Sequence, residues 1–134
     1  MIDEAEISEA LTSRYIPLDL RRFLAKLRGH DAEVKAASFH AVEHYWNTDH
    51  CEGIKNDDAV LRAVCDHPAD EVWARVKPVV FGEVFKQGAH DLWHHVEVEA
   101  SWQKAALSVE RRKKAGSKGG LAKAKRHPRP DSAA

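Results

Sequence analysis

Residues 56–96 read NDDAVLRAVCDHPADEVWARVKPVVFGEVFKQGAHDLWHHV, and the first part of this segment has the pattern of a short helix. Asp57-Asp58 precedes an apolar run that ends at Cys65. Aspartate is a preferred helix cap, and an acidic residue in the first turn favours the positive end of the helix dipole. We therefore expect a helix that begins at this acidic pair.

A second helix is expected directly after the first. Pro68 is well placed for a first helical turn, and the apolar spacing that follows predicts a helix over 68–81. Pro78 should kink this helix or end its regular hydrogen bonding, because proline has no amide hydrogen to donate. The close succession of the two helices resembles a helix-turn-helix.

Two β-prone runs, 83–87 and 92–96, follow the helix pair and flank a turn at 88–91 that contains Gly88. Short runs of this kind around a glycine-containing turn are typical of a β-hairpin. Helices followed by a helix pair and a hairpin form the order of a winged helix, in which 68–81 would be the recognition helix and 83–96 the wing.

Helices are also expected on both sides of this segment. The apolar spacing predicts them upstream over 3–14, 20–27 and 31–47. Downstream, a helix from Val98 should end with 111–114, since Gly116 tolerates the conformation that ends a helix. Beyond Gly116, the content of Gly, Ser, Lys and Pro predicts a mobile tail.

These elements predict a mostly α protein with a small β-hairpin, a winged-helix-like domain with a basic C-terminal helix and tail. We divide the chain into an N-terminal helical extension (1–15), the winged-helix-like domain (16–110) and a basic, flexible C-terminal tail (111–134). About 110 residues outside the tail are enough for one compact domain with one core.

The charge is strongly segregated along the chain. The formal net charge is zero, but nine of the 21 Lys and Arg residues, and only one of the 21 Asp and Glu residues, lie in 111–134. Cationic tails neutralise phosphates and release counterions, whereas an acidic body repels nucleic acid. The expected phosphate contacts are Arg111, Arg112, Lys113, Lys114, Lys118, Lys123, Lys125 and Arg126.

Three cations in the predicted domain are candidates for local DNA contacts. Arg75 and Lys77 lie on the expected recognition helix, and Lys86 lies on the expected wing. Asp70 and Glu71 nearly cancel the charge of that helix, and Glu71 is four residues before Arg75, a spacing at which we expect the two to pair.

An ordered set of short motifs runs along the chain: Pro17-Leu18, Phe23-Leu24, His44-Tyr45-Trp46, Asp57-Asp58, Trp73 with Lys77-Pro78, Phe85, Trp93-His94-His95, and Ala115-Gly116-Ser117-Lys118-Gly119-Gly120. The set resembles the YdaU-like phage and prophage proteins, a domain-of-unknown-function family often found in replication modules, and the resemblance covers about 16 to 126. It implies a winged-helix-like module that acts in phage DNA replication or its control. The chain departs from the family after His95, where Val96 and Glu97 replace a basic pair.

The histidines raise the question of a metal site. His40–His44 fits the H-x-x-E-H pattern, and a third zinc ligand would have to come from His50, Cys51 or Glu52. We predict no metal and no cofactor, because a chain with nine histidines meets a five-residue pattern by chance. His90, His94 and His95 around the hairpin are interpreted as half-exposed strand residues, with pH-dependent phosphate contact as the alternative.

Several classes of protein are not expected. No apolar run approaches the roughly 20 residues needed to cross a bilayer, and the acidic first residues lack the features of a signal peptide. Cys51 and Cys65 are interpreted as reduced thiols, so we expect a cytoplasmic protein. No phosphate-binding glycine loop, Ser-His-Asp arrangement or zinc-finger cysteine spacing is present, which predicts no enzyme activity and no small-molecule substrate.

The leading hypothesis is a non-enzymatic DNA-binding protein that acts in replication or transcriptional control, with affinity supplied by the tail. The alternative is an adaptor whose acidic body binds a host or phage protein, and an exposed Trp102 would favour it. The two hypotheses differ in salt dependence, because electrostatic DNA binding weakens steeply as salt rises.

Overall fold

The computed structural model describes residues 3–12 and 15–126, and for the last ten of these it describes the helical backbone alone. This part of the chain is mostly helical and includes a small antiparallel sheet of three strands. The mostly α fold class with a β-hairpin is therefore confirmed. None of the helices in the described residues is long and apolar enough to cross a membrane.

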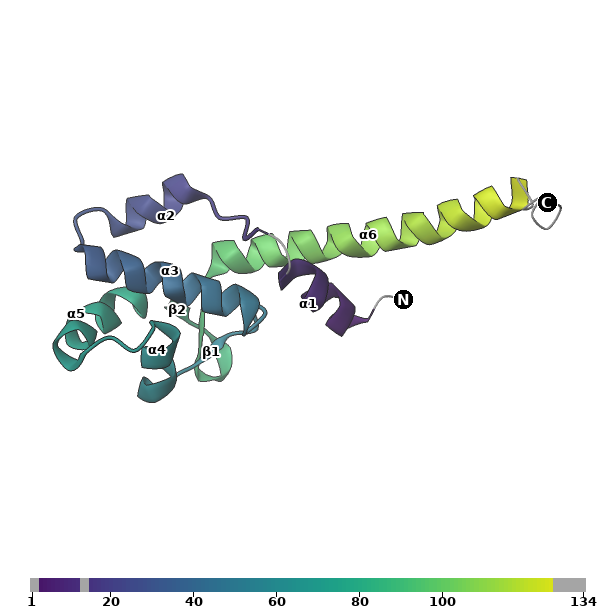
Figure 1. Ribbon diagram of the computed structural model, residues 1–134. Helices are drawn as coiled ribbons and strands as arrows, with labels where there is room; N and C mark the ends of the chain where they lie inside the picture. Colours follow the sequence, from purple (N-terminus) through teal and green to yellow (C-terminus); the bar gives the residue numbers. More distant parts are fainter. Residues whose placement is uncertain (1–2, 13–14, 127–134) are drawn as a thin grey trace.

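Figure 1 shows the arrangement of the elements. The helices are α1 (Glu4–Thr12), α2 (Leu20–Leu27), α3 (Ala32–Asn47), α4 (Asp58–Val64), α5 (Asp70–Val80) and α6 (Val96–Arg126), and the strands are β1 (Ile54–Lys55), β2 (Lys86–Gln87) and β3 (Leu92–His94). The strand order is β1-β3-β2, with Trp93 of β3 opposite Ile54 on one side and Gln87 on the other.

Helix α3 lies at the centre of the body. Its N-terminus is capped by Asp31, whose side chain accepts a hydrogen bond from the Val34 amide at 2.9 Å. Apolar residues that recur every three to four positions along α3 are buried, as the sequence predicts for an amphipathic helix. Helix α5 packs along α3, so the buried face of α3 forms the central part of the core.

Trp46 connects three helices. Its indole Nε1 donates a hydrogen bond to the Leu11 carbonyl of α1 at 3.2 Å, and its ring lies 4.9 Å from that of Trp102 on α6. Trp46 is 1% exposed and Leu11 is fully buried. Residues 4–12, expected as an extension, therefore contribute to the core.

Several expected boundaries differ in the structure. Helix α5 begins at Asp70 rather than at Pro68, whose carbonyl accepts a hydrogen bond from Arg62 Nε at 2.8 Å. The first hairpin strand is shorter than 83–87, because the amides of Val84 and Phe85 donate to the carbonyls of Val79 and Val80 in a turn after α5. Strand β1 was not predicted, since two residues are too few to show a period.

The expected end of the last helix at Gly116 is wrong. Helix α6 continues to Arg126, and its yellow C-terminal part extends well beyond the other elements in Figure 1. Glycine in a helix interior costs about 1 kcal/mol relative to alanine, but alanine, leucine and lysine, which are strong helix formers, surround the glycines here. Residues 127–134 of the predicted tail lie outside the described residues.

Trp46 provides a test of this packing. We expect Trp46→Ala to lower the free energy of unfolding by about 3–5 kcal/mol, because it removes a buried aromatic ring and leaves the Leu11 carbonyl without its donor. Denaturant unfolding would measure the loss. Leu20→Ala is the control: Leu20 is 53% exposed, so its truncation should cost no more than about 0.5 kcal/mol. Equal losses in the two variants would contradict this account of the core.

Candidate nucleic-acid interface

The basic end of α6 is the most cationic element of the protein. Arg111, Arg112, Lys113 and Lys114 are consecutive and exposed, and at about 100° per residue they surround the helix. Lys113 pairs with Glu6 of α1 at 3.0 Å, whereas Arg111 and Lys114 have no ion-pair partner among the residues the structure describes.

The remaining cations of the predicted tail, at positions 118, 123, 125 and 126, belong to the same helix. The helical backbone therefore carries all eight predicted tail contacts, from Arg111 to Arg126, along one continuous element. At 1.5 Å per residue, this stretch is about 22 Å long, which is enough to span the phosphates of several successive nucleotides.

Arg75 is held by acidic residues next to and within α3. Its Nε lies 3.0 Å from Asp31 Oδ2 and its Nη2 lies 2.9 Å from Glu33 Oε2. The hydrogen bond from the Val34 amide and the Arg75 guanidinium together hold the pKa of Asp31 below its usual value. The expected pair between Glu71 and Arg75 is therefore wrong, because Arg75 pairs instead with Asp31, the cap of α3, and with Glu33 in its first turn.

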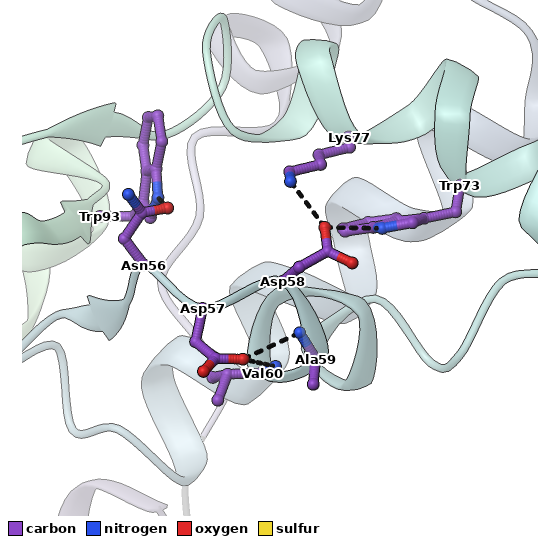
Figure 2. Close-up of polar contacts among 8 residues, drawn as sticks. All are labelled: Asn56, Asp57, Asp58, Ala59, Val60, Trp73, Lys77 and Trp93. Carbon is purple, nitrogen blue, oxygen red and sulfur yellow. Dashed lines mark hydrogen bonds and ion pairs between the residues drawn. The ribbon is translucent and has the colours of Figure 1, made fainter.

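Lys77 points toward α4 rather than away from the protein, as Figure 2 shows. Its Nζ lies 2.6 Å from Asp58 Oδ1, and the same oxygen accepts a hydrogen bond from Trp73 Nε1 at 3.1 Å. These two donors, Lys77 first, lower the pKa of Asp58. Arg75 and Lys77 thus join α5 to its neighbours, and the binding of phosphate by either residue would have to break an ion pair.

Lys86 is exposed on β2, and its Nζ donates to the Gly82 carbonyl. Figure 1 shows α5 at the end of the body opposite to the basic end of α6. The structure therefore does not bring Arg75 and Lys77 together with the cations of α6, and the predicted site residues do not form a single surface.

A basic surface on α2 was missed by the sequence analysis. Arg21, Arg22 and Arg28 are exposed and have no ion-pair partner in the described part of the chain, while Lys26 lies 3.5 Å from Glu97. The sequence has four cations between 21 and 28, but the net negative charge of residues 1–110 as a whole drew attention away from them.

The three hairpin histidines have different environments. His95 is 1% exposed and caps α6: its Nδ1 accepts a hydrogen bond from the Val98 amide at 3.3 Å. Its Nε2 has no hydrogen-bond partner among the described residues, and the rings of Phe23 and Phe85 flank it. Burial, helped by the nearby charge of Lys26, lowers the pKa of His95 to about 4. His95 was wrongly interpreted as half-exposed, and it is not available for contact with phosphate.

His90 is exposed in the turn, whereas His94 lies beside a buried polar cluster. His94 Nδ1 is 3.4 Å from Glu99 Oε2 and 3.4 Å from the Tyr45 hydroxyl. That hydroxyl also lies 3.1 Å from the Cys51 carbonyl. The cluster fastens the start of α6 to α3, and burial raises the pKa of Tyr45.

The residues of the H-x-x-E-H pattern have other partners. His44 Nδ1 lies 2.8 Å from Asp49 Oδ2, and His40 Nε2 lies 3.8 Å from Asp66 Oδ2. Cys51 is buried, which raises the pKa of its thiol to about 12. Within residues 3–12 and 15–126, no three His, Cys, Asp or Glu side chains converge in a way that could hold a metal ion.

Comparisons with models of protein families, with curated proteins and with solved structures find no match to this chain.

The buried His95 predicts a loss of stability in mild acid. The unfolded chain binds a proton near pH 6.5 and the folded chain only near pH 4, so stability is full above pH 6.5 and falls as the pH drops toward 4. We expect His95 alone to remove about 2 kcal/mol between pH 7 and pH 5. Denaturant unfolding at both pH values measures the change.

His95→Asn is the comparison variant, because asparagine can still cap α6 but does not titrate. The variant should have a lower stability at pH 7 and a smaller loss between pH 7 and pH 5. An unchanged pH dependence in His95→Asn would show that another group is responsible.

Proposed function

We propose that the protein is a non-enzymatic DNA-binding protein that contacts phosphates mainly through the basic end of α6. The observation that carries this proposal is the run of four exposed cations, Arg111 to Lys114, on a helix that extends beyond the acidic body. Cations on an extended helix can approach a duplex without bringing the acidic body against it, and phosphate contacts supply most of the affinity in non-specific binding.

The winged-helix-like interpretation of the body has support from its element order. Strand β1 lies between α3 and the pair α4–α5, and β2 and β3 follow, with β1 pairing to β3. Helix α5 would then be the recognition helix. Because Arg75 and Lys77 are ion-paired and Asp70 and Glu71 are exposed, we propose that α5 and the wing make only secondary contacts.

The biological setting, DNA replication or transcriptional control in a phage or prophage, is proposed from the resemblance to the YdaU-like proteins. An adaptor that binds a host or phage protein is the second candidate function. The acidic residues 1–110 favour that alternative, although Trp102, whose exposure would have supported it, is only 9% exposed.

Charge reversal on α6 tests the DNA-binding proposal. We expect Arg111→Glu, Arg112→Glu and Lys114→Glu together to abolish measurable binding to labelled duplex DNA, because they replace attraction to phosphates by repulsion. Fluorescence anisotropy at several salt concentrations would measure the affinity. For the unaltered protein, about six phosphate contacts would lower the affinity roughly a thousandfold between 50 and 200 mM salt.

A matched control changes the same number of charges on α2. Arg21→Glu, Arg22→Glu and Arg28→Glu should weaken binding much less than the α6 triple variant. If the α2 variant loses binding and the α6 variant keeps it, the interface is on α2. If the unaltered protein does not bind duplex or single-stranded DNA even at low salt, the DNA-binding function is refuted and the adaptor becomes the better proposal.

A further inference from the structure

A cleft of about 630 Å³ lies between α1, α6 and the loop after α3. Its apolar lining comes from Ile7, Trp102, Ala106 and Leu107, and Leu107 is 52% exposed. The His50 ring, which also lines the cleft, stacks on Trp102 with 5.5 Å between the ring centroids. Leu107 is the exposed part of this apolar lining, since Trp102 is only 9% exposed and Ile7 and Ala106 are partly buried against the core.

The charged groups around this cleft are almost all acidic. Glu4, Glu52, Glu99 and Glu110 line it, and His50 is the only lining residue that can become cationic. A second hollow beside it adds Asp3 and Glu9. An occupant should therefore be a cationic segment that also has small or apolar residues to pack on Trp102 and Leu107.

The chain itself contains such a segment. Residues 111–126 hold eight Lys and Arg residues and no acidic residue, together with three glycines and one leucine. The segment cannot fold back into its own cleft, because it continues the helix that forms one wall. We propose that the cleft binds the basic end of α6 from a second copy of the chain, forming a two-fold symmetric dimer.

The geometry of α6 makes the contact reciprocal. Cleft residues Glu99, Gln103, Ala106 and Glu110 recur every three to four positions and so lie on one face, which continues into the basic end. Two α6 helices that cross antiparallel near Arg111 place 99–110 of each beside 112–123 of the other, over about 18 Å on either side. Each copy then supplies one cleft and one occupant, as a two-fold axis requires.

The dimer does not depend on the proposed DNA binding. If both occur, they compete for the same cations, and duplex DNA should convert dimer to monomer. A protein that dimerises without binding DNA would leave this inference standing, and one that binds DNA but is a monomer in the absence of DNA would refute it.

Sedimentation velocity over a range of concentrations at low salt tests the inference with the full chain. The unaltered protein should dimerise, and added salt should weaken the dimer. Glu4→Lys with Glu52→Lys should raise the dissociation constant at least about tenfold, because both exposed carboxylates line the cleft. Glu43→Lys with Glu71→Lys makes the same charge change on exposed residues away from the cleft and should leave the dimer unchanged.

Two further measurements separate this contact from general electrostatic attraction. Lys114→Glu with Lys118→Glu should also abolish the dimer, and mixing this variant with the Glu4→Lys, Glu52→Lys variant should restore a mixed dimer, because each cleft again meets opposite charge. A monomer at every concentration, no restoration on mixing, or a dimer unaffected by the cleft variant would overturn the proposal.

Discussion

The fold depends on the adjacent pair Tyr45 and Trp46 near the end of α3. The two side chains are buried in different directions: Trp46 holds α1 and α6, and Tyr45 contacts Phe85 and the polar cluster at the start of α6. Both rings need polar partners because burial without one is costly. The Leu11 carbonyl and the Cys51 carbonyl meet that need and fix where the neighbouring segments lie.

Because the body is fixed in this way, its own cations become structural. Arg75 reaches Asp31 and Glu33, and Lys77 reaches Asp58, so acidic residues that cap or begin helices also hold α5 in place. Exposed ion pairs are individually weak, at about 0–1 kcal/mol, so these contacts orient α5 more than they stabilise the protein. The functional consequence is that α5 presents little free positive charge, whereas α6 presents a great deal.

The two proposals for the protein draw on the same separation of charge. An acidic body with a basic helical extension can bind a polyanion through the extension, and it can also bind a second copy of itself. Salt weakens both interactions, so salt dependence alone does not distinguish them. The contacts that do distinguish them are Glu4 and Glu52 in the cleft, which would matter to the dimer and not to DNA.

The amino-acid pattern alone determined the positions of α2, α3 and α4, since the apolar spacing and the acidic pair Asp57-Asp58 are local signals. It also determined the charge separation between 1–110 and 111–134. Tertiary contacts decided the rest. Strand β1 exists only because Ile54 meets Trp93, the histidine that looked half-exposed is buried between Phe23 and Phe85, and Arg75 pairs with α3 rather than with Glu71. Apart from Phe85 and His95, these partners are 39 or more residues apart in the chain, so no local pattern could indicate them.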